Sequence, residues 1–122
     1  MTQQNDLLHQ LTQAILSGDA LQARVLAQEM YRHPSQLALA TPPASTDPTV
    51  LALAAGLLEL FAQRLNQPSP AWTQLVGALP EPLYLLKAAH TMRRLRELCE
   101  SQSPEPLRRR NLYASPNYLE MV

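Results

Sequence analysis

Apolar residues in the first third of the chain recur at the three- and four-residue spacing of amphipathic helices. A first helix can begin at Asn5 or Asp6, both good N-caps, and Gly18 ends it. Asp19 then caps a second helix, with a glutamine three residues later as in a capping box. The apolar stripes of the two helices consist of Leu7, Leu8, Leu11, Ala14 and Ile15 in the first and Leu21, Val25, Leu26 and Met30 in the second. Because only a short turn separates them, the pattern predicts an antiparallel helical hairpin over residues 1–33.

The most hydrophobic part of the chain follows a loop that is rich in proline, serine and threonine, over residues 34–47. Asp47 as N-cap and Pro48 at the first helical position then predict the start of a third helix. Its apolar stripe, the strongest in the chain, consists of Val50, Leu51, Ala54, Leu57, Leu58, Phe61 and Leu65. We expect this helix to be the centre of the core. A second serine–proline start signal predicts a short helix that carries Trp72.

A short internal repeat, Pro-Glu-Pro-Leu, occurs twice in the C-terminal half of the chain, at residues 80–83 and 104–107. Two prolines one residue apart restrict the backbone on both sides of the glutamate, so each copy predicts a rigid corner. Between the two copies, Thr91 is expected to cap a helix that runs to about Gln102. The apolar side of that helix consists of Met92, Leu95, Leu98 and Cys99.

Together these elements predict an all-α fold, a small helical bundle built on the N-terminal hairpin and the hydrophobic central helix, with an extended or weakly helical C-terminal arm. At 122 residues the chain is long enough for one domain with a substantial core and too short for two ordinary ones. The expected single domain, residues 1–122, comprises the hairpin (1–33), the proline-rich loop (34–47), core and accessory helices (48–103) and the arm (104–122).

Composition and charge argue against two classes of protein. Hydrophobic residues make up 46% of the chain and the formal net charge is zero, unlike a disordered protein or one that binds a polyanion over its whole surface. Residues 1–78 hold three arginines against five acidic residues, a net −2. Residues 79–122 hold six arginines and one lysine against five glutamates, a net +2, so basic character is concentrated near the C-terminus. The arginines at positions 93 and 96 each precede a glutamate by four residues, which predicts ion pairs along one helix.

No residue pattern in the sequence has the spacing of a catalytic, cofactor or metal site. The three histidines, His9, His33 and His90, lie on or beside different predicted elements, so no two of them have the spacing of zinc ligands on one helix face. Cys99 falls on the apolar side of its helix and has no base near it in sequence. We therefore predict a protein that is not an enzyme and that needs no cofactor and no metal.

Cysteine content and the N-terminal residues predict a cytoplasmic protein. A single cysteine cannot form an intramolecular disulfide, and the N-terminus lacks the basic and then apolar pattern of a secretory signal. The longest apolar run, residues 50–58, is shorter than the roughly 20 residues that span a bilayer. We expect no association with a membrane.

The last fifteen residues carry the strongest candidate for a binding segment, because three consecutive arginines precede large apolar side chains on a stretch too short to fold alone. If those side chains pack on the body, the arm completes the core; if they pack on another molecule, the arm is a docking segment. The candidate partner-binding residues are Arg108, Arg109, Arg110, Leu112, Tyr113, Tyr118 and Leu119.

The docking alternative predicts a non-enzymatic protein–protein interaction module, antitoxin-like or an adaptor, whose partner is another protein or a second copy of the chain. The arginine forks would bind carboxylates and the tyrosines would fill apolar pockets on that partner. A rival function is nucleic-acid binding, in which the same arginines contact phosphates and the tyrosines stack on bases. Salt separates the two, because phosphate binding weakens steeply as the salt concentration rises.

The C-terminal third also resembles other proteins. The block is made of Pro80-Glu-Pro-Leu83, Leu95-Arg-Glu-Leu-Cys99 and Ser103-Pro-Glu-Pro-Leu-Arg-Arg-Arg-Asn-Leu-Tyr-Ala-Ser-Pro-Asn-Tyr-Leu119. It is similar to the shared part of a group of small uncharacterised bacterial proteins. The resemblance implies a bacterial cytosolic origin and no particular activity.

Overall fold

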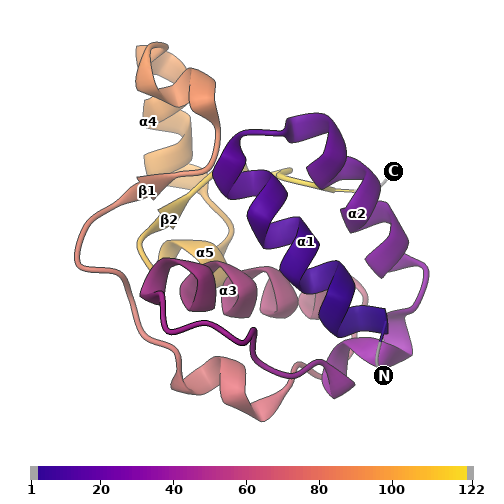
Figure 1. The fold of residues 1–122 in the computed structure, drawn as a ribbon. Coiled ribbons are helices and arrows are strands. Elements are labelled where there is room, and N and C mark those ends of the chain that lie inside the picture. Colours follow the sequence, from indigo (N-terminus) through magenta and orange to yellow (C-terminus); the bar gives the residue numbers. More distant parts are fainter. Residues whose placement is uncertain (1–2, 121–122) are drawn as a thin grey trace.

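The structure is a computed structural model that describes residues 3–120, and it is mostly helical, as the apolar pattern predicts (Figure 1). The α-helices are α1 (Gln3–Ser17), α2 (Ala20–Tyr31), α3 (Pro48–Arg64), α4 (Arg93–Gln102) and α5 (Glu105–Arg108). The short 3-10 helices and the strands are η1 (Pro34–Leu39), η2 (Ala71–Leu75), η3 (Lys87–His90), β1 (Leu83–Tyr84) and β2 (Leu112–Tyr113). No helix within this part of the chain is long and apolar enough to span a membrane.

The turn between α1 and α2 forms as its sequence predicts. Gly18 ends α1 with a φ of +82°, a left-handed conformation that glycine adopts without strain. Asp19 caps α2, because its carboxylate accepts a hydrogen bond from the backbone N–H three residues later at 3.1 Å. The predicted start of α1 is wrong, since the helix already begins at Gln3 and places Asn5 and Asp6 within it.

The face that α2 buries differs in part from the predicted stripe. Its buried residues are Ala23, Leu26, Ala27 and Met30. Leu21 and Val25, which were expected to belong to this face, are 75% and 51% exposed. Alanines occupy the contact because small side chains let two helices approach closely, and this rotates the larger apolar residues toward solvent.

The third helix, α3, is the centre of the core, as its apolar stripe predicts. Asp47 caps the helix by accepting a hydrogen bond from the N–H of Thr49 at 2.9 Å, and Pro48 occupies the first helical position. Residues 52–58 are all buried, because α1, η1, η2 and α5 pack around this helix. In Figure 1, α1 crosses α3 and α5 lies beside it.

The segment after the hairpin is more regular than predicted. Residues 34–39 form η1 where an irregular loop was expected, because a proline at its first position suits a helical turn and Leu37 becomes fully buried. The indole N–H of Trp72 donates a hydrogen bond to the carbonyl of Ala40 at 2.9 Å, which fastens the end of this segment to η2. The short helix at Trp72 therefore exists, although as a 3-10 helix whose last residue, Leu75, is 87% exposed.

A two-stranded parallel sheet, which the sequence pattern does not predict, joins the arm to the body. β1 and β2 pair with Leu83 opposite Leu112 and Tyr84 opposite Tyr113. Each strand is only two residues long, too short for an alternating pattern to indicate it. The first Pro-Glu-Pro-Leu copy leads directly into β1, and the second contains the start of α5.

A glycine lies in α3 where α5 and the arm pack against that helix. A Cβ atom at Gly56 would come within 2.9 Å of Leu107 Cδ2 and 3.5 Å of Leu112 Cδ1, and both leucines are fully buried. We expect Gly56→Val to lower the free energy of unfolding by about 1–3 kcal/mol, because the added carbons overpack this contact. Gly77→Val is the control, since a Cβ atom there would meet nothing within 4 Å. Urea unfolding measures both variants, and equal losses would contradict the close contact at Gly56.

Candidate functional site

The arm that carries the predicted docking residues is packed on the chain's own body. Leu112 is fully buried and Tyr118 is 8% exposed, both within the core around α3. Arg110 is buried as well. The other candidates, which keep part of their surface exposed, are Arg108, Arg109, Tyr113 and Leu119. The arm therefore completes the core, and docking as predicted does not hold for the three buried residues, whose side chains are already covered by the body.

The buried guanidinium of Arg110 is the main electrostatic contact of the arm. Its Nη1 and Nη2 donate to the two carboxylate oxygens of Glu59, each at 2.9 Å, in a bidentate pair. The same nitrogens donate to the backbone carbonyls of Pro106 at 2.8 Å and Thr73 at 2.6 Å. Arg109 contacts the same carboxylate. Arg110 thus connects α3, η2 and α5 through a single side chain.

The carboxyl group of Glu59 is held in its charged form by this arrangement. Burial alone would raise its pKa, but the hydrogen bond from Arg110 and the charges of Arg110 and Arg109 outweigh burial and hold the pKa below the usual 4.5. The carboxylate is therefore ionised at neutral pH and the ion pair is complete. No local sequence signal indicates this pair, because 51 positions separate its members.

Two further polar contacts fix the end of the arm. Nη1 of Arg64 donates to the carbonyl of Tyr118 at 2.7 Å and to the hydroxyl of Tyr31 at 3.0 Å. The N–H of Ala114 donates to the hydroxyl oxygen of Ser103 at 2.8 Å, and both residues are buried. These contacts position the arm against α2, α3 and the end of α4.

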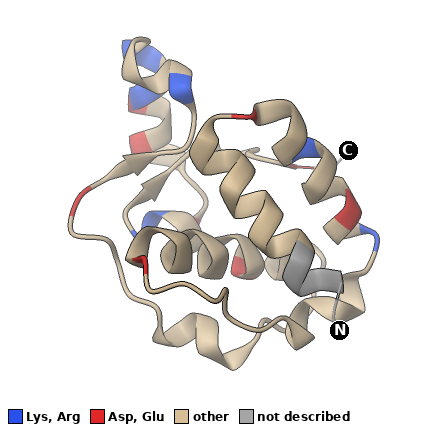
Figure 2. Cartoon of the chain, viewed as in Figure 1, with Lys and Arg blue, Asp and Glu red and all other residues tan. Residues whose placement is uncertain are grey.

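α4 projects from the body and concentrates exposed positive charge (Figure 1). Figure 2 shows cationic positions gathered on this helix and on the segment that precedes it. The side chain of Arg93 is 91% exposed, and its Nε lies 3.2 Å from the carboxylate of Glu97, which confirms the first of the two predicted ion pairs. Arg94 is also exposed.

The start of α4 differs from the prediction. The helix begins at Arg93, and its N-cap is Met92, whose side chain makes no capping hydrogen bond. The hydroxyl of Thr91 instead donates to the carbonyl of Ala88 at 3.4 Å. Thr91, the residue expected to cap α4, therefore forms its hydrogen bond with the preceding 3-10 helix instead.

Two tyrosines lie at the base of α4. The rings of Tyr84 and Tyr113 stack with their centroids 5.4 Å apart and an angle of 29° between the planes. The guanidinium of Arg96 lies 6.0 Å from the centroid of the Tyr84 ring, and the Tyr84 hydroxyl donates to Glu100. The second predicted ion pair is absent, because Arg96 donates instead to two backbone carbonyls of η3, at 3.0 and 2.7 Å. We use the name α4 surface for the exposed Arg93, Arg94 and Arg96 of this helix together with Tyr84 and Tyr113 at its base.

The histidines and the cysteine do not come together in one site. His9 lies on α1, His33 follows α2 next to Glu29 at 3.4 Å, and His90 is the last residue of η3. Cys99 is fully buried, and burial raises the pKa of its thiol, which keeps the thiol protonated at neutral pH. Among residues 3–120 no group of three or more His, Cys, Asp and Glu side chains could hold a metal ion.

Comparison with known proteins adds no relative. No model of a protein family, no curated protein and no solved structure matches the chain. The resemblance of the C-terminal block to small bacterial proteins stays a prediction, and the functional argument rests on the chain's own geometry.

Proposed function

We propose that the protein is a non-enzymatic interaction module of a bacterial cytosol, an adaptor or antitoxin-like protein that binds an acidic protein through its α4 surface. The observation that carries the proposal is the projection of α4 from the body with its arginines exposed (Figure 2). Cys99 is the only buried residue of this helix, so most of its surface is open to a partner. Of the residues first expected to bind, Tyr113 contributes to this surface.

The charge of this region complements a carboxylate-rich partner. The cationic side chains between positions 84 and 102 are Lys87, Arg93, Arg94 and Arg96, against Glu97 and Glu100, a net +2. Arg94 makes no hydrogen bond or ion pair with any residue that the structure describes. A free guanidinium fork binds a carboxylate through two parallel hydrogen bonds. Complementary charge of this kind speeds association and selects among partners.

Two features of the α4 surface favour a protein partner over a nucleic acid. Tyr84 and Tyr113 stack on each other, and Arg96 lies near the ring of Tyr84, so these ring faces contact the chain itself and are less open to bases. Glu97 and Glu100 lie on the same helix and lower its net positive charge, whereas a nucleic-acid-binding surface is usually strongly basic.

Reversal of charge on α4 tests the proposal. The full-length protein with an N-terminal tag is used to isolate a binding protein from nuclease-treated cytosol of the native host, and the dissociation constant of the purified pair is then measured by calorimetry. We expect Arg93→Glu/Arg94→Glu to weaken binding about ten- to a hundredfold, because two attractive contacts become repulsive. The control is Arg24→Glu/Arg32→Glu, which makes the same charge change on and just after α2.

Each other outcome of this experiment has a defined meaning. Equal weakening by the control variant would contradict a specific role for α4. Retention that disappears after nuclease treatment, with affinity that falls log-linearly as salt rises, would support nucleic-acid binding instead. Sedimentation can also show that the wild type associates with itself and that Arg93→Glu/Arg94→Glu does not. In that case the partner of α4 would be a second copy of the chain and not an acidic protein.

A further inference from the structure

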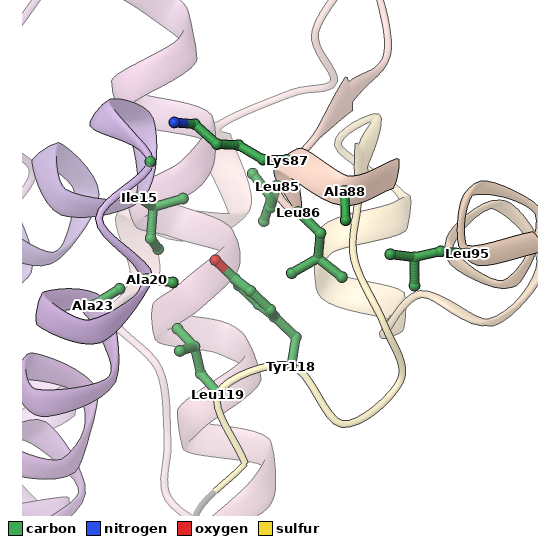
Figure 3. A pocket seen from close by; sticks show the side chains of 11 residues that line it. Ile15, Ala20, Ala23, Leu85, Leu86, Lys87, Ala88, Leu95, Tyr118 and Leu119 are labelled. Carbon is green, nitrogen blue, oxygen red and sulfur yellow. The ribbon is translucent and has the colours of Figure 1, made fainter. Parts of the chain in front are cut away.

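An apolar pocket of about 340 Å³ lies between the α1–α2 turn, the end of the arm and the segment from β1 to α4 (Figure 3). Its walls include Ile15 and Ala23 from the hairpin, Leu86 before η3, Leu95 from α4 and Leu119 from the arm. Small-molecule sites in proteins typically enclose roughly 300–1,000 Å³ and have mostly apolar walls with a few polar groups. The pocket therefore has the size and wall chemistry of a site for a small apolar ligand.

The hydroxyl of a buried tyrosine points into this pocket. The side chain of Tyr118 extends from the arm toward the α1–α2 turn, with its oxygen at the pocket end of the ring (Figure 3). No residue that the structure describes forms a hydrogen bond with this hydroxyl, although the residue is more than nine-tenths buried. Burial raises the pKa of Tyr118 far above its usual 10.0, so the hydroxyl keeps its proton and acts as a donor. A ligand with an acceptor in this pocket would receive a hydrogen bond from this donor.

Lys87 supplies positive charge at the rim of the same pocket. Its side chain lies against the α1–α2 turn, where a Cβ atom on Gly18 would come within 2.7 Å of the lysine Nζ. The ammonium forms no ion pair with any described residue, and no acidic residue lines the pocket. In Figure 3 the side chains of Lys87 and Tyr118 both extend toward this turn.

We propose that the pocket binds an amphiphilic carboxylate of medium chain length, with its alkyl chain against the aliphatic walls and its carboxylate between Lys87 and Tyr118. A carboxylate accepts hydrogen bonds from an ammonium and a phenol at the same time, whereas a cationic head would be repelled by Lys87. At roughly 30 Å³ for each water-sized group, the pocket has room for about ten to twelve non-hydrogen atoms, the size of octanoate or decanoate. The inference is independent of the protein partner proposed for α4.

Calorimetry and amide NMR of the full-length protein with octanoate test this assignment. We expect saturable binding of octanoate, about tenfold weaker binding of octanol, and no binding of octylammonium. Shortening the ligand to hexanoate should weaken binding about fifteenfold, because each methylene removed from an apolar site costs about a factor of four in affinity.

Two substitutions assign the head group. Lys87→Met keeps the aliphatic stem but removes the charge, so octanoate should bind about tenfold more weakly while octanol is unaffected. Tyr118→Phe removes only the hydroxyl and should weaken the binding of octanoate by a similar factor. Arg94→Met, an exposed cation that does not line the pocket, is the control and should bind octanoate as the wild type does.

The results that would overturn the inference are equally specific. One is the absence of saturable octanoate binding at concentrations below micelle formation. Another is that the Lys87→Met variant binds octanoate as tightly as the Arg94→Met variant does. Because Lys87 and Arg94 are both exposed, these two variants are expected to fold, and circular dichroism confirms this before the titrations.

Discussion

Replacement of Arg110 by methionine is expected to lower the free energy of unfolding by about 3–5 kcal/mol. Methionine fills part of the space of the arginine stem, but it cannot neutralise Glu59, and it removes the side-chain hydrogen bonds to the carbonyls of Thr73 and Pro106. Loss of one member of a buried ion pair is costly because the other charge stays buried with less compensation. Urea unfolding followed by circular dichroism measures the change.

Arg109→Met is the matched control, because Arg109 contacts the same carboxylate of Glu59 but its side chain is 44% exposed. Its loss should cost less than about 1 kcal/mol, as for other exposed ion pairs. Because the pKa of Glu59 is lowered in the folded state, its contribution is present above its usual pKa of 4.5 and is lost as the pH falls through the folded-state value. The difference in free energy of unfolding between the wild type and Arg110→Met should therefore become smaller as the pH falls through this acidic range. If Arg109→Met and Arg110→Met lowered the free energy of unfolding equally at neutral pH, that result would contradict the burial of the Arg110–Glu59 pair.

Removal of residues 112–122 is expected to abolish the cooperative unfolding transition of the protein. The deletion takes away β2 and the buried side chains of Leu112 and Tyr118. Truncation of one buried leucine or one buried aromatic residue costs about 2–5 kcal/mol, so the combined loss is comparable with the roughly 5–15 kcal/mol that stabilises an ordinary domain. Circular dichroism and the dispersion of amide NMR signals measure the outcome.

The control for this deletion is a chain that ends at Leu119, which keeps every buried residue of the arm that the structure describes. Its free energy of unfolding should lie within about 1 kcal/mol of that of the full-length protein, because the deletion removes no buried residue that the structure describes. If the chain that ends at residue 111 kept a cooperative transition of similar stability, the arm would not be part of the core. The expected loss of fold also makes that shorter chain unsuitable as bait in a search for partners.

Local signals predict the elements whose ends are set by neighbouring residues. Gly18, Asp19, Asp47 and Pro48 each act within one helical turn, and the structure confirms all four. The β1–β2 pair is different, because its hydrogen bonds join segments that are far apart in the chain. Thr91 has a suitable side chain for a cap, yet the fold of the preceding residues decides which backbone group it contacts.

The same division, between features set by neighbouring residues and contacts between distant segments, applies to the candidate sites. Short-range patterns identified the arm as a segment that must bury its apolar side chains, and Leu112 and Tyr118 do so. They could not identify the molecule against which these residues pack, because Glu59 and the core are distant in sequence. The pocket that includes Lys87 and Tyr118 combines four separate segments, so no spacing rule connects its residues.

The order of the core segments along the chain has a consequence for protein synthesis. The hairpin and α3 leave the ribosome before the partners of Gly56, which lie later in the chain in α5 and β2. Until they emerge, the nascent chain exposes apolar surface of α3 and cannot close its long-range contacts, a state prone to aggregation and recognised by chaperones. A premature stop codon shortly before Tyr118 would therefore yield a substrate for cellular quality control, although the hairpin, α3 and α4 had all been translated.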